Sequence, residues 1–453
     1  MENNENYNNF KLILNKNAKE ILDASQLTEQ LFQLTIHGIY TPLNIITGKF
    51  KKLIYKRIYY IPVFQQQTLA NYVISNDKSN KNWVNSSIVK NKDNVTLYEI
   101  NNFRSLREER RVKNIAIRAV YALNLDYGIV KIGVTSGEKP WVLYVNPNLE
   151  SNQKMESLFE SAIKRFLVNW DKNLISANKK ILIGCDPEFI LQDSYGKMVL
   201  ASTYLPEKGQ AGCDRIWINH DRYQLPLAEI RPIPANEPRQ LVLNLYTSLL
   251  ICSKKITDKK LKWLAGSMPI KNYPLGGHIH LSNISVNSFL LRALDNYLTL
   301  VITLFEDENG IGRRPKYGFL GDYRIKYHGG FEYRTLPSWL VSPTITKGVF
   351  ALTKLIADNY LYLYQNPLEN INVQKAYYEG NKTQLKPIVL NLWNELKELG
   401  DYKLYEKYLV PLEKYINTDF RWNEKIDFRE VWFLPPYHKN IQKNIDSKGH
   451  PPR

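Results

Sequence analysis

The stretch YGFLGDYRIKYHGGFEYRTLPSW, residues 317–339, places charged side chains in a run that otherwise favours β-strand. Within it, Glu332 and Arg334 are two residues apart, and side chains at that spacing on a strand share one face. A carboxylate beside a guanidinium is costly to bury unless each meets a partner. The motif alone leaves two interpretations open: a structural ion pair, or a site for a ligand or metal.

Three upstream stretches repeat this spacing. ILIGCDPEFIL carries Asp186 and Glu188, LPLAEIRPIP carries Glu229 and Arg231, and LGGHIHLSN carries His278 and His280. Strands that are polar on one face and apolar on the other predict a sheet with a buried side and a reactive side. Carboxylates gathered on one face repel unless cations neutralise them, which favours Mg2+ or Mn2+. The arginines suit the anionic oxygens of phosphate or carboxylate.

Size and composition indicate a protein of two or three domains. The 453 residues are 44% hydrophobic, which is enough for a sizeable core. The net charge of +17 comes from lysines spread along the chain, so a basic background composition is favoured over contact with nucleic acid. Three cysteines without metal-ligand spacing favour a reducing, cytoplasmic setting. With no signal peptide and no membrane-spanning apolar run, we expect no membrane association; oligomer formation stays open.

The expected fold class is α+β, in three parts. Residues 1–175 alternate β-like runs with helices and predict a smaller N-terminal α+β domain. Residues 176–365 hold the four charged strands and predict a mostly antiparallel catalytic sheet. A helix expected from Pro238 to Ile256 would cover its buried face. Residues 366–453 predict a helical extension with a basic tail.

A glycine-rich segment between the last two motifs is typical of a loop that wraps an anion. Its cations are Arg313, Arg314, Lys316, Arg324 and Lys326. Asp322 is the carboxylate among them. It is either an ordinary salt-bridge partner in the loop or a group that receives a proton or holds an incoming amine.

The stretch LNLDYGIVKIGVTSGEKPWVLYVNPN predicts a hairpin with strands at residues 128–134 and 141–145. It resembles the end of an ATP-grasp domain, where a leucine-rich helix leads into an acidic strand and then a strand ending in Glu-Val-Asn. The resemblance places Asp126 and Asn146 on metal-facing positions, with Tyr144 where a glutamate is expected. It implies a partial, degenerate module.

Taken together, GCDPEF, AEIRP, GGHIH, YGFLGDYR and FEYRTLPSWL resemble the phage-type and bacterial COOH-NH2 ligases. These amidoligases have the fold of glutamine synthetase and glutamate-cysteine ligase, and the motifs occur in the family's order. The resemblance implies ATP- and Mg2+-dependent (or Mn2+-dependent) formation of an amide or peptide bond through an acyl phosphate. The implied substrates are a small-molecule or peptide carboxylate and an amine.

The resemblance also implies a role for each charged residue. The implied metal ligands are Asp186, Glu188, Glu229, His278 and Glu332. The implied nucleotide-phosphate contacts are His280, Arg231 and Arg334. The implied catalytic groups are Arg324, Arg334 and Asp322. Asp214 lies in GCDRIW, which departs from the expected Gly-Cys-Asp-Gly and leaves the role of Asp214 open.

Two alternatives remain at this point. The same metal and ATP chemistry could phosphorylate a small acid or a guanidine, and product analysis separates this kinase from a ligase. A non-catalytic nucleotide- or nucleic-acid-binding protein is the second alternative. All eight residues of the four pairs are chemically competent, which argues against such a loss of activity.

Overall fold

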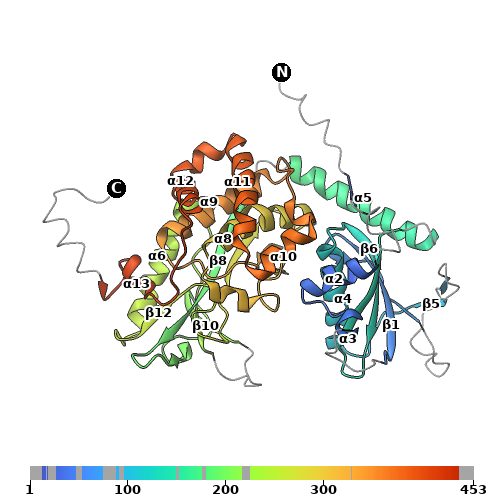
Figure 1. Cartoon of the computed structure of the whole chain (residues 1–453), viewed down its shortest axis with the longest axis horizontal. Helices are drawn as coiled ribbons and strands as arrows, with labels where there is room; N and C mark the ends of the chain where they lie inside the picture. Colours follow the sequence, from blue (N-terminus) through green and yellow to red (C-terminus); the bar gives the residue numbers. More distant parts are fainter. Residues whose placement is uncertain are drawn as a thin grey trace, which may run out of the picture. The chain divides into compact units, whose positions relative to one another are not determined.

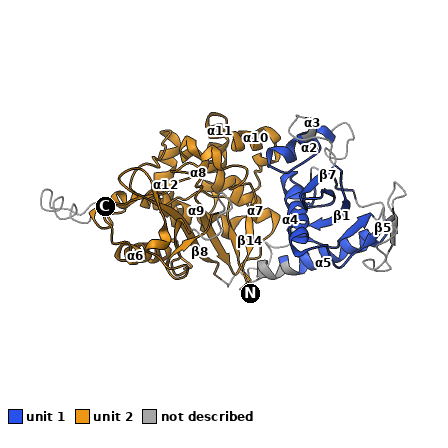
Figure 2. Ribbon diagram, turned by 90° about the horizontal axis from the view of Figure 1, so that it is seen from below, with its two compact units in different colours: residues 1–174 blue, residues 175–453 orange. Residues whose placement is uncertain are grey.

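The computed structural model divides the chain into two units, residues 1–174 and 175–453, and each is described by itself (Figure 2). The structure describes residues 13–16, 18, 27–46, 54–74, 88–90, 96–148, 153–175, 180–216, 225–327 and 329–437. The division falls one residue before the end of the expected N-terminal domain. Both units combine helices with an antiparallel sheet, so the predicted α+β class is confirmed.

The first unit has a sheet in the order β4-β5-β3-β1-β6-β7, with β2 paired to β1. Its strands are β1 (Arg57–Phe64), β2 (Gln67–Thr68), β3 (Tyr72–Ile74), β4 (Ile88–Lys90), β5 (Thr96–Glu99), β6 (Tyr127–Val134) and β7 (Pro140–Asn146). Its helices are α2 (Leu27–Ile36), α3 (Leu43–Ile46), α4 (Leu106–Ala122) and α5 (Gln153–Ile175).

Side chains along β1 point alternately to the two faces of this sheet, and each face packs in its own hydrophobic core. Ile61 and Val63 pack with residues of α4, whereas Phe64 packs with Phe159 and Ala162 of α5. Helix α4 begins at Leu106. The side chain of Ser105 accepts a hydrogen bond from the Glu108 N–H, and this cap sets the start of the helix.

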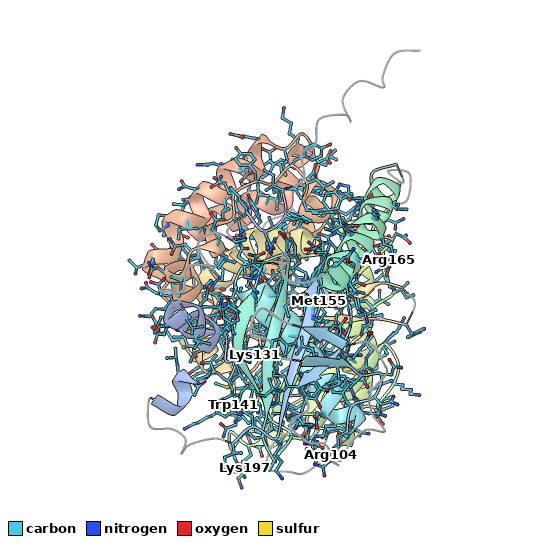
Figure 3. The ribbon with its side chains drawn as sticks, turned by 90° about the vertical axis from the view of Figure 1, so that its right-hand side faces the viewer. Arg104, Lys131, Trp141, Met155, Arg165 and Lys197 are labelled. Atoms are coloured by element: carbon cyan, nitrogen blue, oxygen red, sulfur yellow. The ribbon has the colours of Figure 1, made fainter. Side chains whose placement is uncertain are left out.

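Strands β6 and β7 pair antiparallel, so the predicted hairpin is confirmed. Asp126, just before β6, is buried and accepts hydrogen bonds from Asn15 N at 2.7 Å and Gln65 Nε2 at 3.2 Å. Tyr144 pairs with Lys131, which Figure 3 labels on this sheet. The hydrogen bonds of Asp126 join it to Asn15 and Gln65, and among the described residues Asp126 belongs to no group of three potential metal ligands.

The second unit has a sheet in the order β10-β11-β8-β13-β15-β14, with β9 and β12 also paired to β8. Its strands are β8 (Leu182–Gln192), β9 (Met198–Val199), β10 (Ala211–Asp214), β11 (Leu227–Ile230), β12 (Lys262–Leu264), β13 (Gly277–Ser282), β14 (Tyr323–Ile325) and β15 (Phe331–Tyr333). The four motif strands are β8, β11, β13 and β15. All of the described pairings in this sheet are antiparallel, as predicted.

Helices surround this sheet in Figure 1. They are α6 (Pro238–Lys255), α7 (Ser288–Leu294), α8 (Leu300–Phe305), α9 (Pro343–Asn359), α10 (Ile371–Glu379), α11 (Lys382–Glu398), α12 (Tyr402–Asn417) and α13 (Phe428–Val431). Short turns of 3-10 helix are η3 (Ala201–Thr203), η5 (Glu308–Arg313) and η6 (Pro367–Glu369), and η4 (Asp295–Thr299) is a π-helix. Helix α6 packs against β8, β10 and β11 and ends one residue before the expected Ile256.

Residues 288–305 form one continuous helical stretch through α7, η4 and α8. Within the described chain, this stretch alone is long and apolar enough to cross a membrane, and 89% of it is buried inside the protein. Burial of that kind is typical of a core helix. The Tyr333 hydroxyl donates to Asp295 at 2.5 Å and lies 2.6 Å from the Thr299 hydroxyl, so β15 is tied to the π-helix.

The helices after residue 366, expected as a separate extension, fall within the second unit. Helix α12 packs against α9 and α8, and α11 packs against α8. Further along, the Trp432 indole N–H donates to the Leu340 carbonyl at 2.7 Å. These contacts bury apolar side chains of α11 and α12, including Leu396 and Leu412. The C-terminal helices therefore complete the core behind the sheet.

Candidate active site

Six charged side chains from four strands lie on one face of the second sheet. Strand pairing places Glu229 opposite Glu188, Asp186 opposite His278, and His280 opposite Glu332. Directly opposed residues in an antiparallel pair share a face, and the three pairs are offset from one another by two residues along β8 and β13. They therefore form one stepped row on the same face, across β11, β8, β13 and β15. Arg324 of β14 extends the row, since it lies opposite Glu332.

The row contains three groups of side chains that could each hold a metal ion. In each group the donor atoms lie within 4.8 Å of one another. The groups are Asp186 with Glu229 and His278, Asp186 with His280 and Glu332, and Glu188 with Asp214 and Glu229. Carboxylate oxygens dominate all three groups, and such sets suit Mg2+ or Mn2+.

Asp186 lies at the centre of the row and contacts both imidazoles. Its Oδ1 is 3.1 Å from His278 Nδ1, and its Oδ2 is 3.0 Å from His280 Nε2. Burial raises the pKa of Asp186, but the two imidazoles outweigh burial and hold that pKa well below its usual range. Burial lowers the pKa of His278, but the carboxylates of Asp186, Glu188 and Glu332 outweigh burial and raise it.

Glu188 differs from Asp186 in its partners. Its Oε2 accepts a hydrogen bond from the Gly276 N–H at 2.6 Å. Burial raises the pKa of Glu188 above its ordinary value, although His278 and the Gly276 N–H act against the rise. Gly276 is needed here for space as well, because a β-carbon at that position would lie 2.3 Å from His278 Nε2.

Glu332 is fully buried, and its two oxygens have different surroundings. Oε2 accepts from Arg324 Nε at 2.8 Å and contacts Lys326 Nζ at 2.5 Å. Oε1 lies 3.3 Å from His278 Nδ1, yet it has no hydrogen-bond partner among the described residues. A buried carboxylate oxygen without a hydrogen bond fits an ion at the group of Asp186, His280 and Glu332, since a buried polar atom usually has a hydrogen-bond partner.

Comparison with protein families gives a match over residues 183–434, more than half of the chain and all of the site's strands. The family is described as phage phiEco32-like COOH.NH2 ligase-type 2. The chain belongs to this family of carboxylate–amine ligases. The predicted resemblance is thereby confirmed.

Other comparisons add little. No curated protein matches the chain. Among solved structures, the chain is similar to a bifunctional glutathione synthetase from Pasteurella multocida, with a TM-score of 0.37 and 8% identity. That match covers 60% of the ligase and 54% of the synthetase, so the chain spans about half the length of that protein. A likeness of this degree supports no inference about activity.

The arginines of the ligase site lie at its border. Arg334 Nε is 3.6 Å from Glu332 Oε1, on the same face as predicted. Arg231 pairs with Glu229, and its Nη1 also donates to the carbonyls of Glu207 and Gly209 at 3.2 and 3.4 Å. The absence of a side chain at Gly212 leaves room for this guanidinium. Arg231 is thus engaged within the chain, while a third of its side chain stays exposed.

Two residues of the glycine-rich segment do not serve as the expected anion loop. Arg313 is buried and donates to the carbonyls of Thr335 and Leu336 at 2.9 and 2.8 Å. Arg314 pairs with Glu306 at 2.7 Å. Arg313 thus supports the backbone that follows β15, whereas Arg314 is neutralised by Glu306, and burial lowers the pKa of Arg313. Nearer the site, the Asp322 carbonyl accepts from the Arg334 N–H at 2.8 Å, which joins these two predicted site residues through their main chains.

Sequence reasoning missed or left open three contributions to the ligase site. His280 was predicted as a phosphate contact, but it also belongs to a potential metal group. Asp214, whose role was open, belongs to another such group. Lys326 was counted only as a loop cation, yet it contacts Glu332. Lys326 lies in the turn that follows β14, so strand alternation gave no signal for its direction.

Proposed function

We propose that this ligase joins a carboxylate to an amine at the expense of ATP, through an acyl phosphate, with Mg2+ or Mn2+ bound on the charged face of the second sheet. The side chains proposed to hold the ions are Asp186, Glu188, Glu229, His278, His280 and Glu332. The observation that carries the proposal is Glu332, a fully buried carboxylate in which one oxygen has no hydrogen-bond partner among the described residues and which forms a potential metal group with Asp186 and His280.

The proposed chemistry has two balanced steps. In the first, an oxygen of the substrate carboxylate attacks the terminal phosphorus of ATP, and the bond to the departing ADP oxygen breaks. In the second, the amine nitrogen attacks the acyl carbon of the acyl phosphate, and inorganic phosphate leaves. When bound, divalent ions supply positive charge that neutralises phosphate oxygens. The amine also loses a proton, for which we propose Asp322 as acceptor.

The chain's own cations have a task in both steps. Arg324 and Arg334 border Glu332 from two sides, and their guanidiniums would stabilise the charge on the transferring phosphoryl oxygens. Arg231 is proposed to contact phosphate through the exposed part of its side chain. Such fixed cations stabilise charge without reorganising during the reaction, which is the largest effect in many enzymes.

The test is a screen for Mg2+-dependent ADP release against panels of carboxylic acids and amines, with products identified by mass spectrometry. Glu332→Gln should lower the rate by about 100-fold or more, because a metal ion contributes several kcal/mol and each 1.4 kcal/mol is about tenfold. Glu308→Gln removes an exposed carboxylate of η5 and should leave the rate unchanged. Thermal melting would verify that both variants fold.

Two outcomes would contradict the proposal. A Glu332→Gln protein that folds and retains the full rate would mean that the site is misassigned. A stable phosphorylated acid or guanidine, formed without any amide, would identify the protein as a kinase.

A further inference from the structure

Lys326 occupies an unusual position for a lysine. It follows β14 directly, between Ile325 and Tyr327, whose side chains are 59% and 102% exposed. The side chain of Lys326 is only 20% exposed and turns inward to Glu332. Lysine ammonium groups are strongly hydrated, so an inward turn requires a strong partner.

A tight turn fixes the backbone that carries this lysine. The Lys326 N–H donates to the Gly330 carbonyl at 2.8 Å, and the Gly329 N–H donates to the Lys326 carbonyl at 3.1 Å. Gly329 has a φ of +87°, which favours glycine. The turn connects β14 to β15, so Lys326 is held opposite the strand that carries Glu332.

The partner is a carboxylate that already has other cations. Arg324 donates to Glu332 Oε2 through Nε at 2.8 Å and lies at 2.6 Å through Nη2. Lys326 Nζ contacts this same oxygen at 2.5 Å. One carboxylate charge cannot balance two cations on one oxygen, and Arg334 lies near its other oxygen. The surplus positive charge at Glu332 suits further anionic oxygens.

A divalent ion at Glu332 would change this balance. The ion would share the carboxylate with Lys326 and repel its ammonium, since like charges disfavour each other at such separations. Arg324 is a rigid fork that fits a carboxylate, whereas lysine is a compact charge on a flexible stem. Lys326 is therefore the cation able to leave Glu332 and contact another anion beside the ion.

We infer that Lys326 is a further substrate-positioning residue, which neutralises Glu332 in the metal-free protein and contacts nucleotide phosphoryl oxygens once a divalent ion is bound. The inference rests on the proposed function. We name phosphoryl oxygens as the partner because an ion at Glu332 would also bind them. The Lys326 ammonium beside that ion would then lie close enough to contact the same oxygens.

The test measures binding and does not require ligase activity. Mn2+ binding is followed by electron paramagnetic resonance without nucleotide, and binding of the β,γ-imido analogue of ATP is measured by calorimetry at saturating Mn2+. In Lys326→Met, Mn2+ should bind about tenfold more tightly, because a competing cation is gone. The analogue should bind about tenfold more weakly, because a charged contact is lost.

Three controls make the result specific. Lys326→Arg keeps the competing charge, so its Mn2+ affinity should lie within about threefold of that of the unmodified protein. The analogue should still bind more weakly than to the unmodified protein, because a rigid guanidinium fork stays on Glu332. Lys262→Met removes an exposed lysine of β12, which pairs with Gln192 at the far end of β8, and should change neither affinity. Lys326→Gln provides a second neutral variant if the methionine variant melts at a lower temperature.

The outcomes separate this inference from the proposed function. If Mn2+ binds and depends on Glu332, but both neutral variants bind Mn2+ and the analogue normally, Lys326 is a structural ion-pair partner and the inference is overturned. Weaker binding of both ligands in these variants would also overturn it, since Lys326 would then only hold Glu332 in place. If the unmodified protein binds no Mn2+, the proposed function fails as well.

Discussion

Gly276 lies directly before β13 and contacts two of the proposed metal ligands. Its N–H donates to Glu188, and its lack of a side chain leaves space for the His278 ring. Groups that orient metal ligands in this way commonly contribute 10- to 100-fold to metal affinity.

We expect Gly276→Ala to weaken Mn2+ binding by about tenfold, because the new methyl group displaces the His278 ring. Isothermal titration calorimetry would measure the change. Gly400→Ala is the matched control, since a β-carbon at this exposed glycine would meet nothing within 4 Å. Unchanged Mn2+ affinity in Gly276→Ala would show that His278 does not contribute to metal binding.

Residues on regular strands could be predicted because alternation is a local property. Asp186, Glu188, His278 and Glu332 were assigned to one face for this reason, and the strand register places them there. Lys326 could not be assigned, since a turn decides its direction. Asp214 depends on the pairing of β10 with β11, which no local pattern specifies.

Among the elements, α11 carries a lysine in an unfavourable position. Lys382 is the first residue of this helix, where the positive end of the helix dipole opposes a cation. Its ammonium donates to the Glu306 carbonyl. Burial, with the nearby charge of Arg421, lowers the pKa of Lys382 to about 8 from an ordinary value of 10.5. Helix α11 thus begins with a group that is easier to deprotonate in the folded protein.

The sign of the resulting pH dependence follows from this lowered pKa. Between pH 8 and 10.5 the unfolded chain binds more protons at Lys382 than the folded protein, so stability gains from this residue as pH rises. We expect the stability of the unmodified protein relative to Lys382→Met to increase from pH 7.5 to 9.5 in urea titrations. The exposed Lys403→Met of α12 should show no such trend. A difference independent of pH would contradict the expectation.

Elements were predicted best where start signals are local. Ser342 and Pro343 at the start of helix α9 are a local start signal, and the Ser342 side chain accepts from the Ile345 N–H as such caps do. The basic segment that holds Arg313 was predicted as an anion-wrapping loop. In the structure the Arg313 guanidinium instead donates hydrogen bonds to the carbonyls of Thr335 and Leu336. A long-range contact to backbone carbonyls cannot be predicted from the pattern of residues.

At the scale of the whole molecule, each unit has its own sheet and its own buried side chains. Ile132 belongs to the core of the first unit and Leu355 to the buried residues of the second, and neither is exposed to solvent. The division at residue 174 falls in the polar run DKNLISANKK, residues 171–180, which can be recognised in the sequence. Inclusion of the C-terminal helices in the second unit depends instead on tertiary packing.

We expect calorimetry of the full chain to show two thermal transitions, one for each unit. Ile132→Ala should lower one of them and Leu355→Ala the other, since such truncations cost about 2–5 kcal/mol. Mn2+ should raise only the transition that Leu355→Ala lowers, because binding stabilises the state that binds. A single transition that both variants lower equally would mean that the units unfold together.

The pairing of the site's carboxylates with cations of the chain has a consequence for how the protein is made. Asp186 meets two histidines, Glu229 meets Arg231, and Glu332 meets Arg324. The polypeptide therefore supplies its own counterions and can fold during synthesis before any divalent ion arrives. Loading with the proposed metal would then resemble ion exchange on a resin, in which the metal replaces protons and side-chain cations on a surface that is already assembled.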